Sequence, residues 1–181
     1  LPVYLILGLC CGAIGAFFVK CLSFSERAFA ATRLPVPMRP VLGAVILGLI
    51  GLTVFWLGSS KSVPLFYGNG YPAIKTILHP DTYYSGTGSE LVSVSTILWG
   101  LLGLAVIKLI ATSVTVGSGG AGGLFAPSLL VGSATGGCVG YVVHLCGFFP
   151  DTSPIYFALV GMAATVAATT HAPLTAILIV Y

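Results

Sequence analysis

The stretch VTVGSGGAGGLFAPSLLVG, residues 114–132, decides the fold of this chain. It has a cluster of glycines at its centre, apolar sequence on both sides and no charged side chain. Pro127 falls in the first turn of the helix predicted to follow, where a missing N–H breaks no helical hydrogen bond. The stretch therefore predicts a helix that stops, bends and resumes within an apolar environment.

The composition places that environment in a lipid bilayer. Hydrophobic residues make up 57% of the 181 residues, charged residues 6%, and the mean hydropathy is +1.07, beyond what a water-soluble domain carries. Segments 1–19, 41–60 and 91–107 approach the roughly 20 residues that cross about 30 Å of hydrocarbon. Glycine and proline divide segments 109–150 and 152–181 into shorter pieces. The sequence predicts an all-α, polytopic membrane helical bundle with broken and half-length helices.

The chain begins at Leu1 and ends at Tyr181, inside an apolar segment. We therefore expect a piece of a larger membrane protein, truncated at both ends. The expected segments are a first span 1–22, a basic loop 23–40, spans and a half-length helix 41–116, the glycine bend with its helix N-terminus 117–127, and further helices 128–181.

The net charge of +3 comes mainly from Lys20, Arg27, Arg33 and Arg39, which we place in one loop. By the positive-inside rule this cluster alone predicts a cytoplasmic loop. The basic residues are few and flanked by membrane segments, so we expect no nucleic-acid partner. Lys108 lies inside an apolar span, where a charge is by default a functional candidate. We favour a structural role for it, reaching an interface or pairing with a helix C-terminus.

The side chains that could perform chemistry are sparse. The five cysteines and three histidines form no CxxC pair or His/Cys cluster, so no metal or cofactor is expected. We see no paired carboxylates and no nucleophile beside a base, which argues against an enzyme. His171 precedes a helix break, and we assign it a capping or interface role.

The glycine bend also matches GxGxxG at Gly117, Gly119 and Gly122. A dinucleotide site needs an acidic residue about 20 positions downstream, and the first one is Asp151. A phosphate-binding loop would continue with Gly-Lys-Ser or Gly-Lys-Thr, which is missing here. Nucleotide binding is therefore disfavoured.

A better interpretation is an anion site at the N-terminus of the helix near Leu124. The first amides of a helix lack intrahelical acceptors, and the helix dipole is positive there. Partial charges hold an anion weakly enough to release it, whereas a full charge would hold it too tightly for flux. The alternative is a structural membrane subunit whose glycines serve packing alone, as the GxxxG spacings of Gly132, Gly136 and Gly140 would.

Three stretches together resemble the CLC family of chloride channels and chloride–proton antiporters. GSGGAGGLFAP, residues 117–127, is similar to the family's GxFxP anion-binding motif. YGNGYPAI, residues 67–74, resembles its glycine-rich entry to a short helix, and FALVGMAATVAATTHAPLTAILIVY, residues 157–181, resembles its small-residue segment followed by APLT. The likeness runs through essentially the whole chain in consistent order.

The resemblance implies the second half of the inverted-repeat CLC fold, in a bacterial inner-membrane homodimer with one pathway for chloride or a similar anion in each subunit. It implies a dimer interface at the first helix and the last two, and an extracellular basic loop, against the charge count. The family's proton-relay and gating glutamates would lie upstream, so channel and exchanger both stay open. The implied anion contacts are backbone amides of Gly123, Leu124, Phe125 and Ala126, with turn support from Gly117, Ser118, Gly119, Gly120, Gly122 and Pro127.

Overall fold

The computed structural model describes residues 2–57, 65–85, 90–91, 93–147 and 152–180. Parts of the expected segments 41–116 and 128–181 lie outside these residues. The described chain is a helical bundle, as the sequence predicts, and four of its helices are long and apolar enough to cross a membrane. The helices are α1 (Pro2–Ala31), α2 (Arg39–Leu57), α3 (Tyr71–Ile77), α4 (Val94–Gly117), α5 (Phe125–Leu145), α6 (Pro154–Thr170) and α7 (Pro173–Val180).

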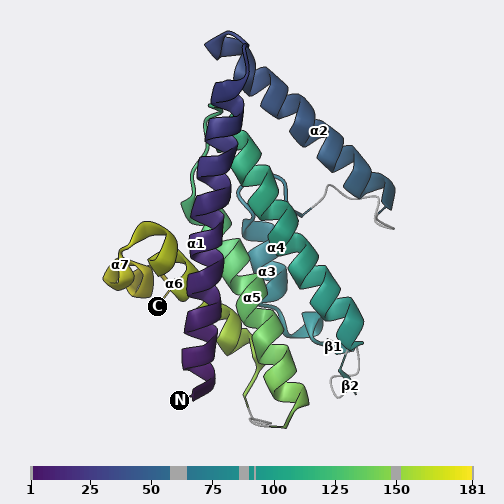
Figure 1. Ribbon diagram of the computed structural model, residues 1–181. Helices are drawn as coiled ribbons and strands as arrows, with labels where there is room; N and C mark the ends of the chain where they lie inside the picture. The colour runs from purple at the N-terminus through teal and green to yellow at the C-terminus, as the bar shows by residue number, and fades with distance from the viewer. Residues whose placement is uncertain (1, 58–64, 86–89, 92, 148–151, 181) are drawn as a thin grey trace.

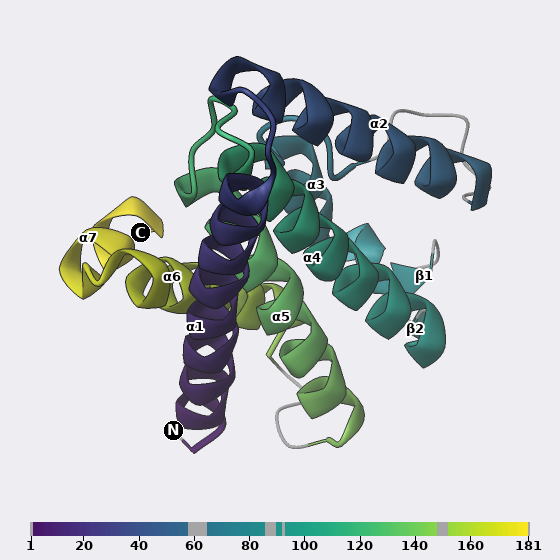
Figure 2. The same ribbon diagram turned by 45° about the horizontal axis from the view of Figure 1, so that its top comes forward.

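Helix α5 is the centre of the bundle. It packs against α6, α4, α3 and α1, and most of its side chains are buried. In Figure 1 α5 passes behind α1 and lies beside α4, while α7 lies on the other side of α1 and α6 runs from α7 behind α1 to α5; Figure 2 shows the same arrangement. The buried side chains of Leu130, Ala134 and Tyr141 place α5 in the main core cluster.

The predicted GxxxG packing is confirmed where α5 crosses α6. A Cβ added at Gly132 or Gly140 would come within 2.9 Å of atoms of α6, and one at Gly136 would lie 2.9 Å from the Cα of Ala158. The absence of side chains at these positions is what lets the two backbones touch. Glycine is therefore a packing residue on this face of α5.

The prediction of a basic loop over residues 23–40 is wrong for most of that range. Helix α1 continues to Ala31, and a 3-10 turn (Val36–Met38) leads into α2. The residues between Leu22 and Arg33 contain no glycine or proline and include strong helix formers, so charge alone did not end the helix. The added turns bury Ser25 and Phe29, which brings the end of α1 against the glycine bend.

Helix α3 confirms the predicted half-length helix. It has seven residues, begins after Gly70 in a left-handed conformation (φ 83°), and buries Ala73, Ile74 and Ile77. A 3-10 turn (Pro80–Thr82) and two short paired strands, β1 (Tyr84–Ser85) and β2 (Glu90–Leu91), connect it to α4. Helix α2 extends away from the bundle in both views (Figures 1 and 2) and contacts α4.

Candidate functional site

The glycine bend closes α4 and then runs open to α5. The amide of Gly119 donates to the carbonyl oxygen of Val116 at 2.9 Å, and that of Gly120 donates to Thr115 at 3.0 Å. Gly119 has φ 86°, a left-handed conformation that favours glycine. A Cβ at Gly120 would lie 2.7 Å from the Thr115 carbonyl oxygen. These two glycines make the tight turn.

Beyond that turn, as far as Ala126, the backbone N–H groups have no acceptor among the residues that the structure describes. Within the described residues, the first amide of the α5 region that donates a backbone hydrogen bond is that of Ser128, to the Leu124 carbonyl at 3.0 Å. Pro127 has no N–H at all. The positive end of the α5 dipole lies at the same place. The amides left free are those of Ala121, Gly122, Gly123, Leu124, Phe125 and Ala126.

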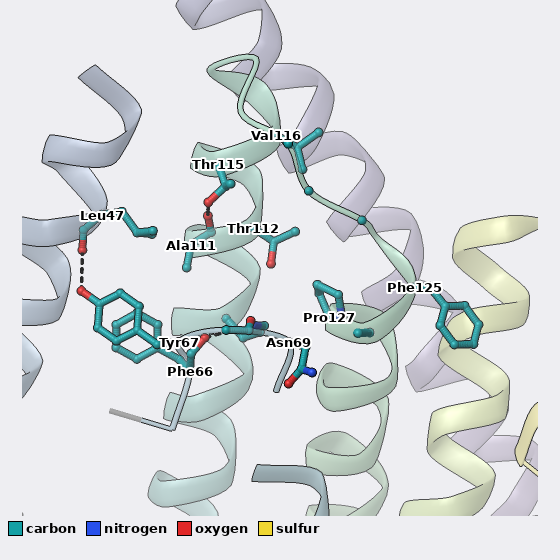
Figure 3. Close-up of a pocket in the computed structure, with 16 residues that line it drawn as sticks. Leu47, Phe66, Tyr67, Asn69, Ala111, Thr112, Thr115, Val116, Phe125 and Pro127 are labelled. Atoms are coloured by element: carbon teal, nitrogen blue, oxygen red, sulfur yellow. Dashed lines mark hydrogen bonds between the residues drawn. The ribbon is translucent and has the colours of Figure 1, made fainter. Parts of the chain in front are cut away.

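A cavity of about 540 Å³ lies against this run of free amides (Figure 3). One wall is the bend and the first turn of α5, another is α4, and a third is the segment that precedes α3. The lining residues are Leu47, Phe66, Tyr67, Gly68, Asn69, Lys108, Ala111, Thr112, Thr115, Val116, Ala121, Gly122, Gly123, Phe125, Ala126 and Pro127. The bend is thus open to a cavity and is not sealed by aliphatic side chains.

Of the four expected anion contacts, Gly123, Phe125 and Ala126 line this cavity, and Leu124 does not. The Leu124 side chain packs against the main core cluster and borders a small gap beside Phe18 of α1. A Cβ at Gly123 would meet nothing within 4 Å. A methyl side chain at Gly123 would therefore have room, so close packing among the described residues does not require glycine there.

The supporting residues divide into two groups. Gly122 and Pro127 line the cavity, while Gly117, Ser118, Gly119 and Gly120 do not. A Cβ at Gly117 would lie 2.7 Å from the Cβ of Ser25 in α1. The Ser118 hydroxyl donates to the Thr115 carbonyl at 2.9 Å. The second group therefore shapes the end of α4.

Lys108 has partners that the sequence did not predict. Its side chain is only 4% exposed, so it does not reach an interface. Its Nζ donates to the carbonyl oxygens of Phe66, at 2.9 Å, and Gly68, at 2.6 Å. These carbonyls belong to the segment before α3, not to a helix C-terminus. In the sequence, the signal for this contact was the isolated charge of Lys108 within an apolar span.

The hydroxyl-bearing side chains that line the cavity were also not predicted from the sequence. Tyr67 donates to the Leu47 carbonyl of α2 at 3.1 Å, which links α2 to the segment before α3 (Figure 3). Thr112 and Thr115 come from α4. Threonine is common in apolar helices, so nothing in its spacing marks these residues.

The described residues form a bundle of apolar helices with a cavity where the chain breaks between α4 and α5. This is the arrangement of an integral membrane protein with an internal site. The family model for the voltage gated chloride channel matches residues 1–181. A ClcB-like chloride channel protein of Ralstonia nicotianae is 36% identical over 98% of this chain and 36% of its own length. Chloride channel protein CLC-f of Arabidopsis thaliana is 34% identical over all of this chain and 22% of its own. The chain belongs to the voltage-gated chloride channel family.

A voltage-gated ClC-type chloride channel, ClcB, of Escherichia coli is 31% identical over 96% of this chain. It is matched over 36% of its length. The chain therefore spans about a third of the bacterial relatives.

Proposed function

We propose that this chain forms part of a pathway that transports chloride or a similar small anion across a membrane. The observation that carries the proposal is the run of six free amides from Ala121 to Ala126, with the cavity against it. The relatives named above are described as chloride channels. Family membership and local geometry thus point to the same substrate class.

The chemistry of the bend suits transport better than tight binding. Amide dipoles at a helix N-terminus attract an anion without a full charge in contact with it. A conducting site has to release its ion as well as hold it, which partial charges allow. Irregular backbone at membrane depth is tolerated where it lines a cavity. The free amides at Gly123 and Phe125 meet both conditions.

We further propose a homodimer in a bacterial inner membrane, with α1, α6 and α7 at the interface. In this bundle α1 packs on α6 and α6 packs on α7. Gly8 and Gly12 of α1 have no atom within 4 Å of an added Cβ, so this GxxxG face has no neighbour among the described residues. A second subunit would supply one.

The second candidate, a structural subunit without transport, is less well supported. Packing explains Gly132, Gly136 and Gly140, which contact α6. It does not explain Gly123, whose Cβ position is empty, or the amides beside the cavity. No enzyme activity and no cofactor are proposed, and chloride enters only as substrate.

The test is ion flux through the complete protein in liposomes loaded with chloride. We expect chloride efflux above that of protein-free liposomes when a potassium ionophore lets potassium leave together with chloride. No membrane potential then builds up to oppose the efflux. A proton gradient that drives chloride uphill would assign proton-coupled exchange, and its failure to do so would assign a channel. No efflux under either condition would contradict the proposed function.

A further inference from the structure

Two threonines of α4 line the cavity and differ in how their hydroxyl protons are used. The Thr115 hydroxyl donates to the Ala111 carbonyl of its own helix at 2.8 Å. Thr112 is only 7% exposed, and its hydroxyl forms no hydrogen bond with any residue that the structure describes. The Thr112 oxygen is not among the fully enclosed side-chain atoms that lack a partner, so this unpaired hydroxyl is accessible from the cavity that Thr112 lines.

The position of Thr112 suggests what its hydroxyl serves. Figure 3 shows its side chain between α4 and the first turn of α5, where Pro127 is labelled. The free amides of Phe125 and Ala126 belong to that same turn. An anion beside those amides accepts hydrogen bonds only, so a hydroxyl facing it has to donate its proton.

Lys108 places positive charge on the same face of α4. Residues four apart in a helix are neighbours, so Lys108 lies one turn from Thr112, and both line the cavity. The Phe66 and Gly68 carbonyls hold the Lys108 ammonium group. The ammonium group therefore adds to the field in the cavity from a fixed position, while the Thr112 hydroxyl is free to bind.

We propose that the Thr112 hydroxyl is a direct anion ligand, which donates a hydrogen bond from α4 to the ion held by the α5 amides. The site then has two walls, backbone amides on one and a side-chain hydroxyl on the other. This inference rests on the proposed function, because it assigns a ligand to the same anion. Thr115 is not a ligand, since its proton is already donated within α4.

The experiment measures chloride binding to the complete, detergent-purified protein by isothermal titration calorimetry. The variants are Thr112→Val, which keeps the shape and removes the hydroxyl, Thr112→Ser, which keeps the hydroxyl, and Thr115→Val as the matched control. We expect chloride binding about tenfold weaker in Thr112→Val. Thr112→Ser and Thr115→Val should stay within about twofold of the wild type. Thermal unfolding of each variant shows whether the fold is retained.

The outcomes separate this inference from the proposed function. Equal chloride affinity in Thr112→Val and wild type, or equal losses in Thr112→Val and Thr115→Val, would overturn the role of Thr112 and leave chloride transport standing. If Thr112→Val does not fold, Thr112→Ser against Thr112→Ala replaces the comparison, and equal affinities there overturn the inference. A wild-type protein that neither binds nor transports chloride would overturn both.

Discussion

The Lys108 ammonium donates to the Gly68 carbonyl at 2.6 Å, which ties the middle of α4 to the segment that precedes α3. The same Nζ holds the Phe66 carbonyl at 2.9 Å. One buried charge thereby satisfies two backbone oxygens of an irregular segment, which would otherwise lack donors. The contact fixes one wall of the cavity.

Replacement of Lys108 by Met should destabilise the complete protein by about 2–6 kcal/mol. The variant leaves the Phe66 and Gly68 carbonyls without their donor, and each loss costs roughly 1–3 kcal/mol. Thermal unfolding in detergent measures the change. The matched control is Lys75→Met in α3, an exposed lysine, which should change stability by less than about 0.5 kcal/mol. Equal stability of the two variants would rule out the structural role of Lys108.

A methyl group at Gly136 should separate α5 from α6. The added Cβ would lie 2.9 Å from the Cα of Ala158, a backbone atom that cannot move alone. We expect Gly136→Ala to cost about 1–3 kcal/mol, the usual range for overpacking.

The control is Gly48→Ala in α2, where the new Cβ has no neighbour within 4 Å. Alanine is the better helix former, so this variant should be neutral or slightly stabilising. Denaturant unfolding of both variants measures the difference. A Gly136→Ala protein as stable as Gly48→Ala would show that the α5–α6 contact is looser than described.

His171 ends α6 with φ 55°, a left-handed conformation that other residues than glycine adopt at a cost. We expect His171→Gly to stabilise the protein by up to about 1 kcal/mol, because glycine carries no steric penalty there. His171→Ile should destabilise it, since a branched side chain suits this conformation poorly. Calorimetric unfolding measures both, and the reverse order would exclude the capping role.

A larger side chain at Gly123 should block the cavity without harming the fold. Its Cβ position is empty, so Gly123→Leu introduces no clash with described residues and fills space beside the free amides. We expect chloride flux to fall at least tenfold in liposomes. Gly100→Leu on α4, equally free of neighbours and outside the cavity lining, should keep the wild-type flux. Equal flux in the two variants would place the pathway elsewhere.

Sequence alone predicted the helices well because glycine and proline mark their ends. The bend before Phe125 is rich in glycine, and the break at His171 lies two residues before Pro173. The end of α1 was missed, since charged side chains on an exposed helical turn resemble a loop in composition. The sequence between Leu22 and Arg33, which has no glycine or proline, is compatible with a helix, and the structure shows that this part of α1 buries Ser25 and Phe29.

The site was predicted on one wall only. Gly123, Phe125 and Ala126 follow from the motif and from the chemistry of helix N-termini, and they do line the cavity. The opposite wall, with Lys108 and Thr112, comes from a different helix, and its approach to α5 is a tertiary contact that spacing does not encode. The two contacts of Lys108 and the unpaired hydroxyl of Thr112 are therefore visible only in the structure.

The most direct test of the anion site is a crystal structure of the complete protein with bromide in place of chloride. Anomalous scattering locates bromide without reference to any assumed pathway. The account predicts an anomalous peak in the cavity, within hydrogen-bond reach of the amides of Phe125 and Ala126 and of the Thr112 hydroxyl. Bromide bound elsewhere in the membrane region, with this cavity empty of it, would contradict the central claim.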